Sequence, residues 1–332
     1  MHIAVIGLGL IGGSVLRAVS AAGHRAYGYD ADPATRAMAR TAAGQARPAH
    51  RWQVTASISD AAAHAELVVI AVPWPAFTDV IDELASSGYS GLVTDVVSVK
   101  GPVREVVANR WRRSGLALAG FVGGHPMAGR ETSGFAASDP ALFRGCAWAL
   151  CLEQDETLLD DWLTVATLAT KLGARVVPTT AADHDVAVAS VSHVPHLLAA
   201  ALVHIAADNP LALTLGAGSY HDGTRVAASP PELTGAMCGA NATAVAASLA
   251  AVIDELGTAA SALDSKDPIS ALRTWLAPAS TARREWPPAP SAPTELPAKA
   301  DVLTRLGRHG GWITSVAADR THVTAVRPVP AR

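Results

Sequence analysis

The chain has 332 residues, a formal net charge of −3, 50% hydrophobic residues and 17% charged residues. This length suits two ordinary domains, and the charge balance offers no basic surface for nucleic acid or an anionic membrane. The three cysteines form no CxxC pair or metal-like cluster, and no basic region opens a signal peptide, so we expect a cytoplasmic protein without a metal site or membrane partner.

Short apolar runs alternate with helical stretches through the first half of the chain. Continuous apolar strands separated by helices are typical of a parallel sheet that helices cover on both faces. We therefore expect an α/β fold, with a Rossmann-type, doubly wound parallel sheet over residues 1–155. The predicted strands are 2–7, 25–30, 66–73, 91–98, 115–124 and 145–153, and the predicted helices are 11–22, 32–44 and 75–87.

The pattern changes after about residue 155. Four stretches rich in Ala, Leu and Val have helical spacing, and one strand-like piece lies between the first two. They are 156–172, 174–180 (the strand), 181–208, 209–220 and 230–264. We expect an all-helical dimerisation and substrate domain over 156–276, since long apolar helices such as 236–260 need more burial than one subunit offers. The sequence thus predicts a homodimer.

The C-terminal part is Pro-rich. Residues 277–298 are predicted to form an extended linker or surface wrap. In the segment 299–332 we expect a short helix near 300–308 and a hairpin over 312–326 that turns at Asp319–Thr321.

A glycine motif follows the first predicted strand. Gly7, Gly9 and Gly12 give the spacing G-x-G-x-x-G where a helix opens, and Asp30 ends the next strand. In this context the first glycine makes a tight turn, the second admits the pyrophosphate, and the third lets helix and strand pack closely. The carboxylate at position 30 is expected to accept hydrogen bonds from ribose hydroxyls and to repel a 2′-phosphate. The motif predicts a dinucleotide site that prefers NAD to NADP.

Neighbouring residues extend this cofactor site. Leu10 and Ile11 lie between the glycines, and Val72 and Pro73 follow the strand 66–73 at the sheet edge where ligands bind. Arg36 lies on the second predicted helix and is the residue that would allow NADP to bind in place of NAD.

Four further stretches carry polar residues within an apolar background. They are TDVVSVKG (94–101), GGHPMAGRETSG (123–134), ADHDVAVASVSHVPH (182–196) and GSYHDGTRVAASPPEL (218–233). Together with the glycine motif, this ordered set resembles the prephenate/arogenate dehydrogenase family of tyrosine biosynthesis, from residue 1 to roughly 265. The HPMAG and SHxPH elements are specific in combination.

The resemblance implies NAD-dependent oxidative decarboxylation of prephenate to 4-hydroxyphenylpyruvate, with arogenate as the alternative substrate. His125 occupies the position of the family's catalytic histidine, and histidine accepts a proton near neutral pH. Ser98 matches a serine that hydrogen-bonds the same hydroxyl or the histidine; as an alternative, it caps the following helix. Lys100 is expected to anchor its loop through Asp95 or to contact the cofactor.

The same resemblance implies a substrate pocket. Arg225 matches the arginine that binds a substrate carboxylate, which a guanidinium does through two parallel hydrogen bonds; a surface ion pair with Asp222 is the alternative. His196 is expected near the substrate with His193 lining the pocket, and Arg130 is a candidate for binding the second carboxylate or for substrate selectivity.

Two other interpretations of the histidines stay open. His184 and Asp185 would form a buried pair at the domain junction, a junction that Asn241 would also serve. His184, His193 and His196 are the candidates for a metal site, but they lack the clear spacing of metal ligands. No metal is therefore predicted.

Some residues depart from the family pattern. Tyr220, His221 and Thr234 replace residues common in the family's fourth stretch, which bears on the choice between prephenate and arogenate. The tail beyond the Pro-rich segment is too short for the complete ACT domain that many relatives carry. A β-hydroxyacid or pyrroline-type dehydrogenase and a non-catalytic NAD-responsive regulator are the alternative functions, although neither requires His125, Ser98 and Arg225 together.

Overall fold

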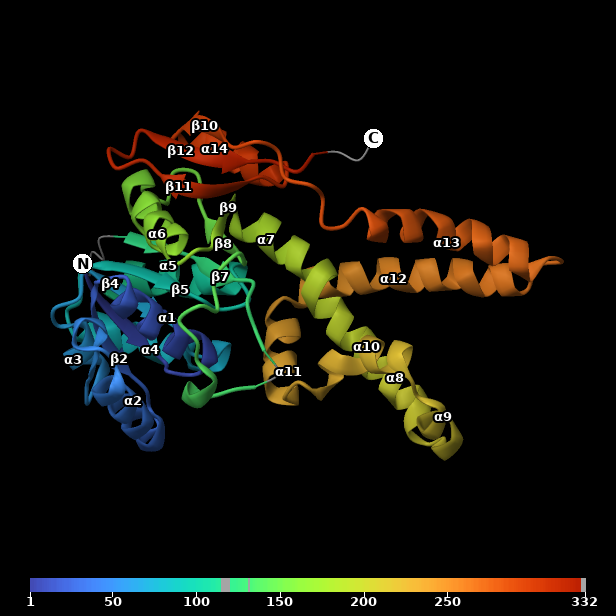
Figure 1. Cartoon of the computed structure of the whole chain (residues 1–332), viewed down its shortest axis with the longest axis horizontal. Helices are drawn as coiled ribbons and strands as arrows, with labels where there is room; N and C mark the ends of the chain where they lie inside the picture. Colours follow the sequence, from blue (N-terminus) through green and yellow to red (C-terminus); the bar gives the residue numbers. More distant parts are fainter. Residues whose placement is uncertain (115–119, 131, 330–332) are drawn as a thin grey trace. The chain divides into compact units, whose positions relative to one another are not determined.

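The computed structural model describes residues 1–114, 120–130 and 132–329, and the chain forms two compact units. Unit 1 contains Met1–His184 and Pro293–Arg327. Unit 2 contains Asp185–Ala292 together with the residues from Pro328 onwards. Figure 1 shows both units with most of their helices and strands labelled.

The first sheet of unit 1 is entirely parallel and has the strand order β3-β2-β1-β4-β5-β6. This order reverses direction between β1 and β4, which is the doubly wound arrangement that the sequence predicted. Its strands are β1 (His2–Ile6), β2 (Arg25–Tyr29), β3 (Gln53–Val54), β4 (Leu67–Ile70), β5 (Leu92–Asp95) and β6 (Gly120–Val122). The helices between them are α1 (Leu10–Ala21), α2 (Pro33–Gln45), α3 (Ile58–Ala62), α4 (Trp74–Ser86) and α5 (Gly101–Ser114).

Local sequence signals explain where these elements begin. The Asp32 side chain accepts hydrogen bonds from the amides of Ala34 and Thr35, and Pro33 occupies the first helical position of α2. Strand β4 is buried along its whole length because helices cover both faces of a parallel sheet. The predicted strand 115–124 is two short strands, β6 and β7 (Gly124–Pro126), and its residues 115–119 lie outside the described part.

A second, mixed sheet of unit 1 joins segments far apart in sequence, in the order β10-β12-β11-β9-β8-β7. The C-terminal hairpin therefore pairs with β9, a contact that the sequence analysis did not predict. The strands are β8 (Ala147–Cys151), β9 (Arg175–Thr179), β10 (Thr294–Pro297), β11 (Trp312–Val316) and β12 (His322–Val326). The accompanying helices are α6 (Leu159–Lys171) and α14 (Ala300–Arg308).

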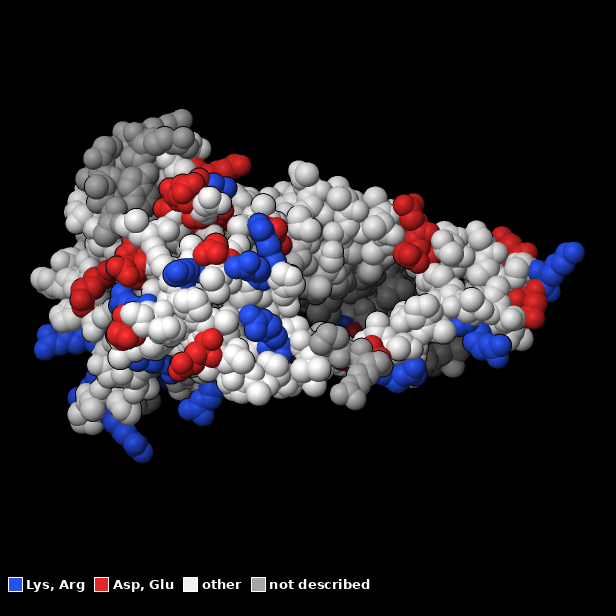
Figure 2. Space-filling model, turned by 90° about the horizontal axis from the view of Figure 1, so that it is seen from above, with Lys and Arg blue, Asp and Glu red and all other residues white. Residues whose placement is uncertain are grey.

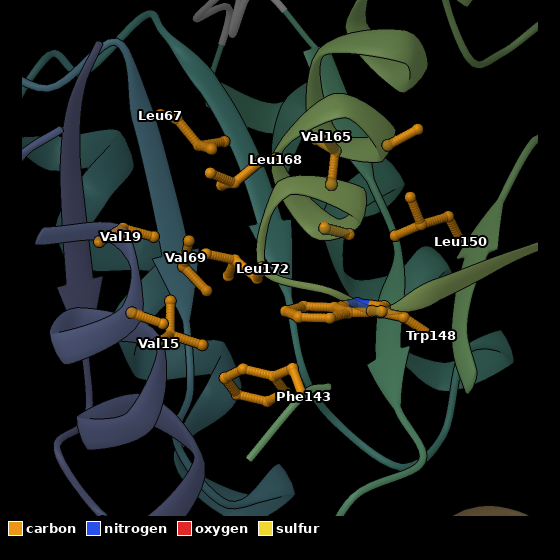
Figure 3. Close-up of a cluster of buried hydrophobic side chains, with 14 of the residues drawn as sticks. Val15, Val19, Leu67, Val69, Phe143, Trp148, Leu150, Val165, Leu168 and Leu172 are labelled. Atoms are coloured by element: carbon orange, nitrogen blue, oxygen red, sulfur yellow. The ribbon is translucent and has the colours of Figure 1, made fainter. Parts of the chain in front are cut away.

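The core of unit 1 connects the two sheets. Leu168, in α6, and Leu172, at its C-terminal end, lie beside Val69 of the first sheet and Trp148 of the second (Figure 3). Each such side chain, when fully buried, contributes about 1.5–3 kcal/mol. Helix α6 thus belongs to the body of unit 1.

Unit 2 consists of helices. The helix α7 (Ala181–Val188) continues through a π-helical turn (Ala189–His193) into α8 (Val194–Ala207). The others are α9 (Pro210–Leu215), α10 (Gly218–Thr224), a 3₁₀ turn (Arg225–Ala228), α11 (Pro231–Ala240), α12 (Ala242–Leu263) and α13 (Pro268–Arg284). Figure 1 shows α12 and α13 side by side as a hairpin. Its buried cluster is small, formed by Ala189, Val194 and Val245.

Three predicted boundaries differ from the structure. The N-terminal segment of unit 1 runs to His184 and does not end near residue 155, because α6 packs into the core of unit 1 and β9 belongs to its second sheet. The predicted linker 277–298 begins inside a helix, since α13 runs to Arg284 with Pro278 in its interior. The segment 299–332 does form the predicted helix and hairpin, but these complete the sheet of unit 1.

Candidate active site

The glycine loop connects β1 to α1. Gly7 has φ +94°, a left-handed conformation that favours glycine, and a Cβ there would lie 2.5 Å from the Ala71 carbonyl oxygen. A Cβ on Gly12 would lie 1.9 Å from the Gly7 oxygen, whereas one on Gly9 would meet nothing within 4 Å. The first turn of α1 has no side-chain cap. Space beside Gly9 and uncapped amides are what a pyrophosphate requires.

Asp30 follows β2 next to this loop. Its Oδ2 accepts a hydrogen bond from the Leu8 amide at 2.7 Å, and its Oδ1 accepts one from the Asp32 amide at 2.9 Å. These bonds orient the carboxylate and leave lone pairs for ribose hydroxyls. Arg36 donates to the carbonyl oxygens of Asp30 and Ala31, at 2.6 and 3.0 Å. This guanidinium is therefore held by the backbone beside the predicted ribose site.

The remaining predicted cofactor residues surround the same loop. Leu10 and Ile11 are the first two residues of α1, and Ile11 packs against the core. A Cβ on Gly7 would lie 2.9 Å from Val72 Cγ1, so Val72 lies directly against the turn. Pro73 precedes the first residue of α4. The residues around the glycine loop therefore suit the binding of a dinucleotide.

A buried ion pair fixes the backbone before His125. Asp95, at the end of β5, pairs with Lys100, and both side chains are at most 1% exposed. Asp95 Oδ1 accepts from the Gly124 amide at 3.0 Å, and Lys100 Nζ donates to the Gly124 carbonyl oxygen at 2.7 Å. A Cβ on Gly124 would lie 2.6 Å from the Asp95 carbonyl oxygen. The predicted anchoring role of Lys100 is confirmed, and it extends to the strand that carries His125.

His125 is half-buried in β7, where it is paired with Ala149 of β8. Its Nδ1 lies 2.9 Å from Nε2 of His184, in the first turns of α7, and the two rings meet edge to face at 67°. From the sequence, His184 was predicted to lie at the domain junction, and no contact with His125 was expected. The stretch ADHD contained it, but no local pattern indicated its contact with a strand 59 residues earlier.

Ser98 and Arg130 lie on loops of unit 1. Ser98 is half-buried, and its hydroxyl makes no hydrogen bond within the described residues. Helix α5 begins at Gly101, so Ser98 does not occupy the cap position that its alternative interpretation required. Arg130 forms an ion pair with Asp139 at 2.6 Å on an exposed loop. This pairing occupies part of the guanidinium predicted to bind a second carboxylate.

The predicted substrate residues of unit 2 are close to one another. His196 lies in the first turn of α8, and burial lowers its pKa; the Arg225 guanidinium lowers this pKa further, while a hydrogen bond with the Val226 backbone opposes both effects. Nδ1 of His196 is buried and has no partner within the described part of the chain. The Arg225 guanidinium and the His196 imidazole thus lie near each other. This arrangement is suited to a ligand that carries a carboxylate and a hydroxyl.

His193 occupies a more interior place in unit 2. It is 0% exposed, at the end of the π-helical turn. Asn241 approaches its Nδ1 to 3.2 Å and donates to the Asp185 carbonyl oxygen at 2.7 Å. Asn241 therefore braces the start of unit 2. Among the described residues, no group of three or more His, Cys, Asp or Glu side chains has a metal-binding arrangement.

Comparison with known proteins identifies the family. Residues 15–178 match the model of the prephenate dehydrogenase nucleotide-binding domain, and residues 180–277 match that of the prephenate dehydrogenase dimerization domain. The chain is 32% identical to a prephenate dehydrogenase of Bacillus subtilis over 70% of its own length and 62% of that protein's. It is 31% identical to a cyclohexadienyl dehydrogenase of Zymomonas mobilis, over 70% and 78% of the two lengths.

A solved structure gives the same result. The prephenate dehydrogenase of Aquifex aeolicus, crystallised with hydroxyphenyl propionate and NAD⁺, superposes with a TM-score of 0.74 at 26% identity, over 85% of this chain and 97% of that one. The two domain matches follow one another in the predicted order; the first begins just after the glycine loop and contains His125, and the second contains His196 and Arg225. The chain belongs to the prephenate/arogenate dehydrogenase family.

Proposed function

We propose that the protein catalyses the NAD-dependent oxidative decarboxylation of prephenate to 4-hydroxyphenylpyruvate in the cytoplasm, with arogenate as the alternative substrate. The observation that carries this proposal is His125, whose backbone is clamped by a buried ion pair and whose Nδ1 is engaged by His184. A general base needs such fixed geometry before it needs a tuned pKa.

The cofactor site supports NAD. The amides at the start of α1 and the space beside Gly9 suit the pyrophosphate, and the oriented carboxylate of Asp30 suits an unphosphorylated ribose. NAD⁺, when bound, takes up the hydride that leaves the ring carbon bearing the hydroxyl. Leu10, Ile11, Val72 and Pro73 would enclose the dinucleotide.

The remaining residues supply proton transfer and orientation. His125 accepts the hydroxyl proton at Nε2, and the unbonded hydroxyl of Ser98 donates to the substrate oxygen. Arg225 binds a carboxylate of the ring substrate, with His196 beside it; His193 shapes the wall behind them, and Arg130 contributes to selectivity. Orientation of the ring accelerates the reaction because a fixed geometry removes much of the entropic barrier.

Unit 2 also favours a homodimer. Its apolar side chains are widely exposed, including Ile205 (81%), Leu215 (72%) and Ile269 (83%). White, uncharged surface predominates over the helices on the right of Figure 2. The helices 181–207 and 242–263 have the length and composition of membrane spans. Only 28% and 6% of the apolar stretch in each helix is buried. A second copy of the chain accounts for this surface, because the matching domain model is one for dimerization.

The test is a comparison of four rates: prephenate and arogenate, each with NAD⁺ and NADP⁺. We expect prephenate with NAD⁺ to have the highest kcat/KM. A higher value with arogenate would reassign the substrate. Reduction of NAD⁺ by small β-hydroxyacids but by neither ring substrate would replace the proposal with the β-hydroxyacid dehydrogenase, and NAD⁺ binding without any turnover would favour a regulator.

A further inference from the structure

His184 is held rigidly against His125. It is 4% exposed, and its Nε2 lies 2.9 Å from His125 Nδ1. The start of α7 is anchored from three sides. The Asp183 amide donates to Thr180 Oγ1, the Ala181 amide donates to the Glu153 carboxylate, and Arg308 of the C-terminal segment pairs with Asp183 at 3.0 Å. The position of the His184 ring therefore depends on the framework of unit 1.

The contact restricts where the protons are. Each neutral imidazole carries one hydrogen, so one of the two facing nitrogens donates and the other accepts. If His184 were the donor, His125 would carry its hydrogen on Nε2 and would have no lone pair for a substrate proton. If His125 donates from Nδ1, its Nε2 carries no hydrogen and has a lone pair that can accept a proton, and His184 carries its hydrogen on Nδ1.

We propose that His184 is a positioning residue that keeps His125 in the Nδ1–H form and stabilises its protonated form. The inference rests on the proposed function. When the substrate O–H bond breaks, its proton forms an N–H bond at His125 Nε2, and the electron pair of that bond forms the C=O bond as the hydride leaves the same carbon for NAD⁺. The bond to the ring carboxylate then breaks, CO₂ leaves, and its electron pair stays with the ring that becomes aromatic. His125 is then an imidazolium, and its Nδ1–H donates a charge-assisted hydrogen bond to His184 Nε2, which is stronger than the neutral one.

The arrangement is analogous to the carboxylate that holds the histidine of a serine hydrolase in its working tautomer. Here the acceptor is an imidazole in place of a carboxylate. In the tautomer that we propose, it selects the Nδ1–H form of His125 and stabilises the imidazolium without placing a carboxylate charge beside the base. Hydrogen-bonding partners that orient metal-bound histidines are worth about 10- to 100-fold in activity, and we expect an effect of similar size here.

The test uses His184→Phe, which keeps a ring but has no acceptor, and His184→Gln, whose amide oxygen can take the place of Nε2. The exposed His64→Phe serves as the matched control. We expect His184→Phe to lower kcat by about 10- to 100-fold with KM for prephenate and NAD⁺ affinity changed less than about threefold. His184→Gln should recover most of the lost kcat. Equal kcat for His184→Phe and wild type would overturn the inference, as would equal losses in both His184 variants.

A second readout does not depend on turnover. In ¹⁵N-histidine-labelled wild-type protein, the ring signals of His125, assigned by their loss in His125→Asn, should be those of the Nδ1–H tautomer. An Nε2–H signal at neutral pH would overturn the inference, even if His184→Phe fails to fold. An inactive wild-type enzyme with the Nδ1–H signal would overturn the proposed function and leave the positioning role supported.

Discussion

The two units differ in how they are stabilised. Unit 1 buries a continuous core that joins two sheets, and its glycine loop, Asp95–Lys100 pair and His125–His184 contact are all built on that core. Unit 2 has only a small buried cluster among its described residues, and long apolar helices with exposed faces. The difference teaches that unit 1 can fix a reacting group within one chain, whereas the exposed apolar helices of unit 2 are the surface that the proposed homodimer would cover.

The largest effect is expected from a variant that tests whether unit 2 binds the substrate in addition to forming the proposed homodimer. Arg225→Leu removes a guanidinium that would bind a substrate carboxylate through two charge-assisted hydrogen bonds, each worth about 1.5–3 kcal/mol. We expect kcat/KM for prephenate to fall by about 100-fold or more, mainly through KM. Steady-state kinetics measures this, and Arg225→Lys should be intermediate because it keeps the charge but loses the fork. An unchanged KM would confine unit 2 to assembly.

The cofactor preference tests the corresponding site of unit 1. Asp30→Asn removes the charge that repels a 2′-phosphate and weakens the hydrogen bonds to the ribose. We expect the affinity for NAD⁺ to fall by about 10-fold and the preference for NAD⁺ over NADP⁺ to narrow, as measured by calorimetric titration of both dinucleotides. Asp60→Asn, an exposed carboxylate on α3, is the matched control. A preserved preference would show that selectivity lies elsewhere.

The exposed helices of unit 2 test the dependence on a second copy. Leu256→Glu places a charge on α12, where the wild-type side chain is 53% exposed. Because burying an unpaired charge is unfavourable, we expect the dimer dissociation constant to rise by about 10-fold or more. Light scattering over a concentration series measures it, with the exposed Lys266→Glu as control. A wild-type protein that is monomeric at micromolar concentration would contradict the assembly.

The smallest effect concerns pH. Burial and Arg225 lower the pKa of His196 in the folded chain, so the unfolded chain binds more protons as the pH falls below about 6.5. The contribution of His196 to stability is therefore present above that pH and is lost as the pH falls towards the folded-state pKa. Urea unfolding at pH 7.5 and 5.5 should show a smaller loss in His196→Gln than in wild type. Equal losses would contradict the assignment.

Local patterns predicted the glycine loop and the strands of the first sheet other than β3, because these follow from short-range rules; the predicted strand 145–153 is β8 and belongs to the second sheet. Apolar strands, Asp32–Pro33 at a helix start and the glycine spacing each have a consequence within a few residues. The domain boundary could not be predicted in this way. The same spacing that makes α6 a helix does not reveal whether it packs in a helical domain or against the sheets of unit 1.

The site was predictable only in part for the same reason. His125 was identified through a motif, and its loop anchor through Asp95 and Lys100 five residues apart. The His184 contact depends on β8, which pairs with β7 on one side and with β9 on the other and so brings the start of α7 to β7 across a long sequence separation. The C-terminal end of α13 was predicted wrongly, because the Pro-rich composition of 277–298 indicated an extended segment, whereas Pro278 lies inside the helix.

The most direct test is the His125→Asn variant with prephenate and NAD⁺. Asparagine keeps a polar side chain at this position, but its amide cannot act as a base and accept the substrate proton. Turnover should fall by about two orders of magnitude or more while the dissociation constant for NAD⁺ stays within about twofold of wild type. Turnover equal to that of the wild type would contradict the account, because another group would then have to take the proton.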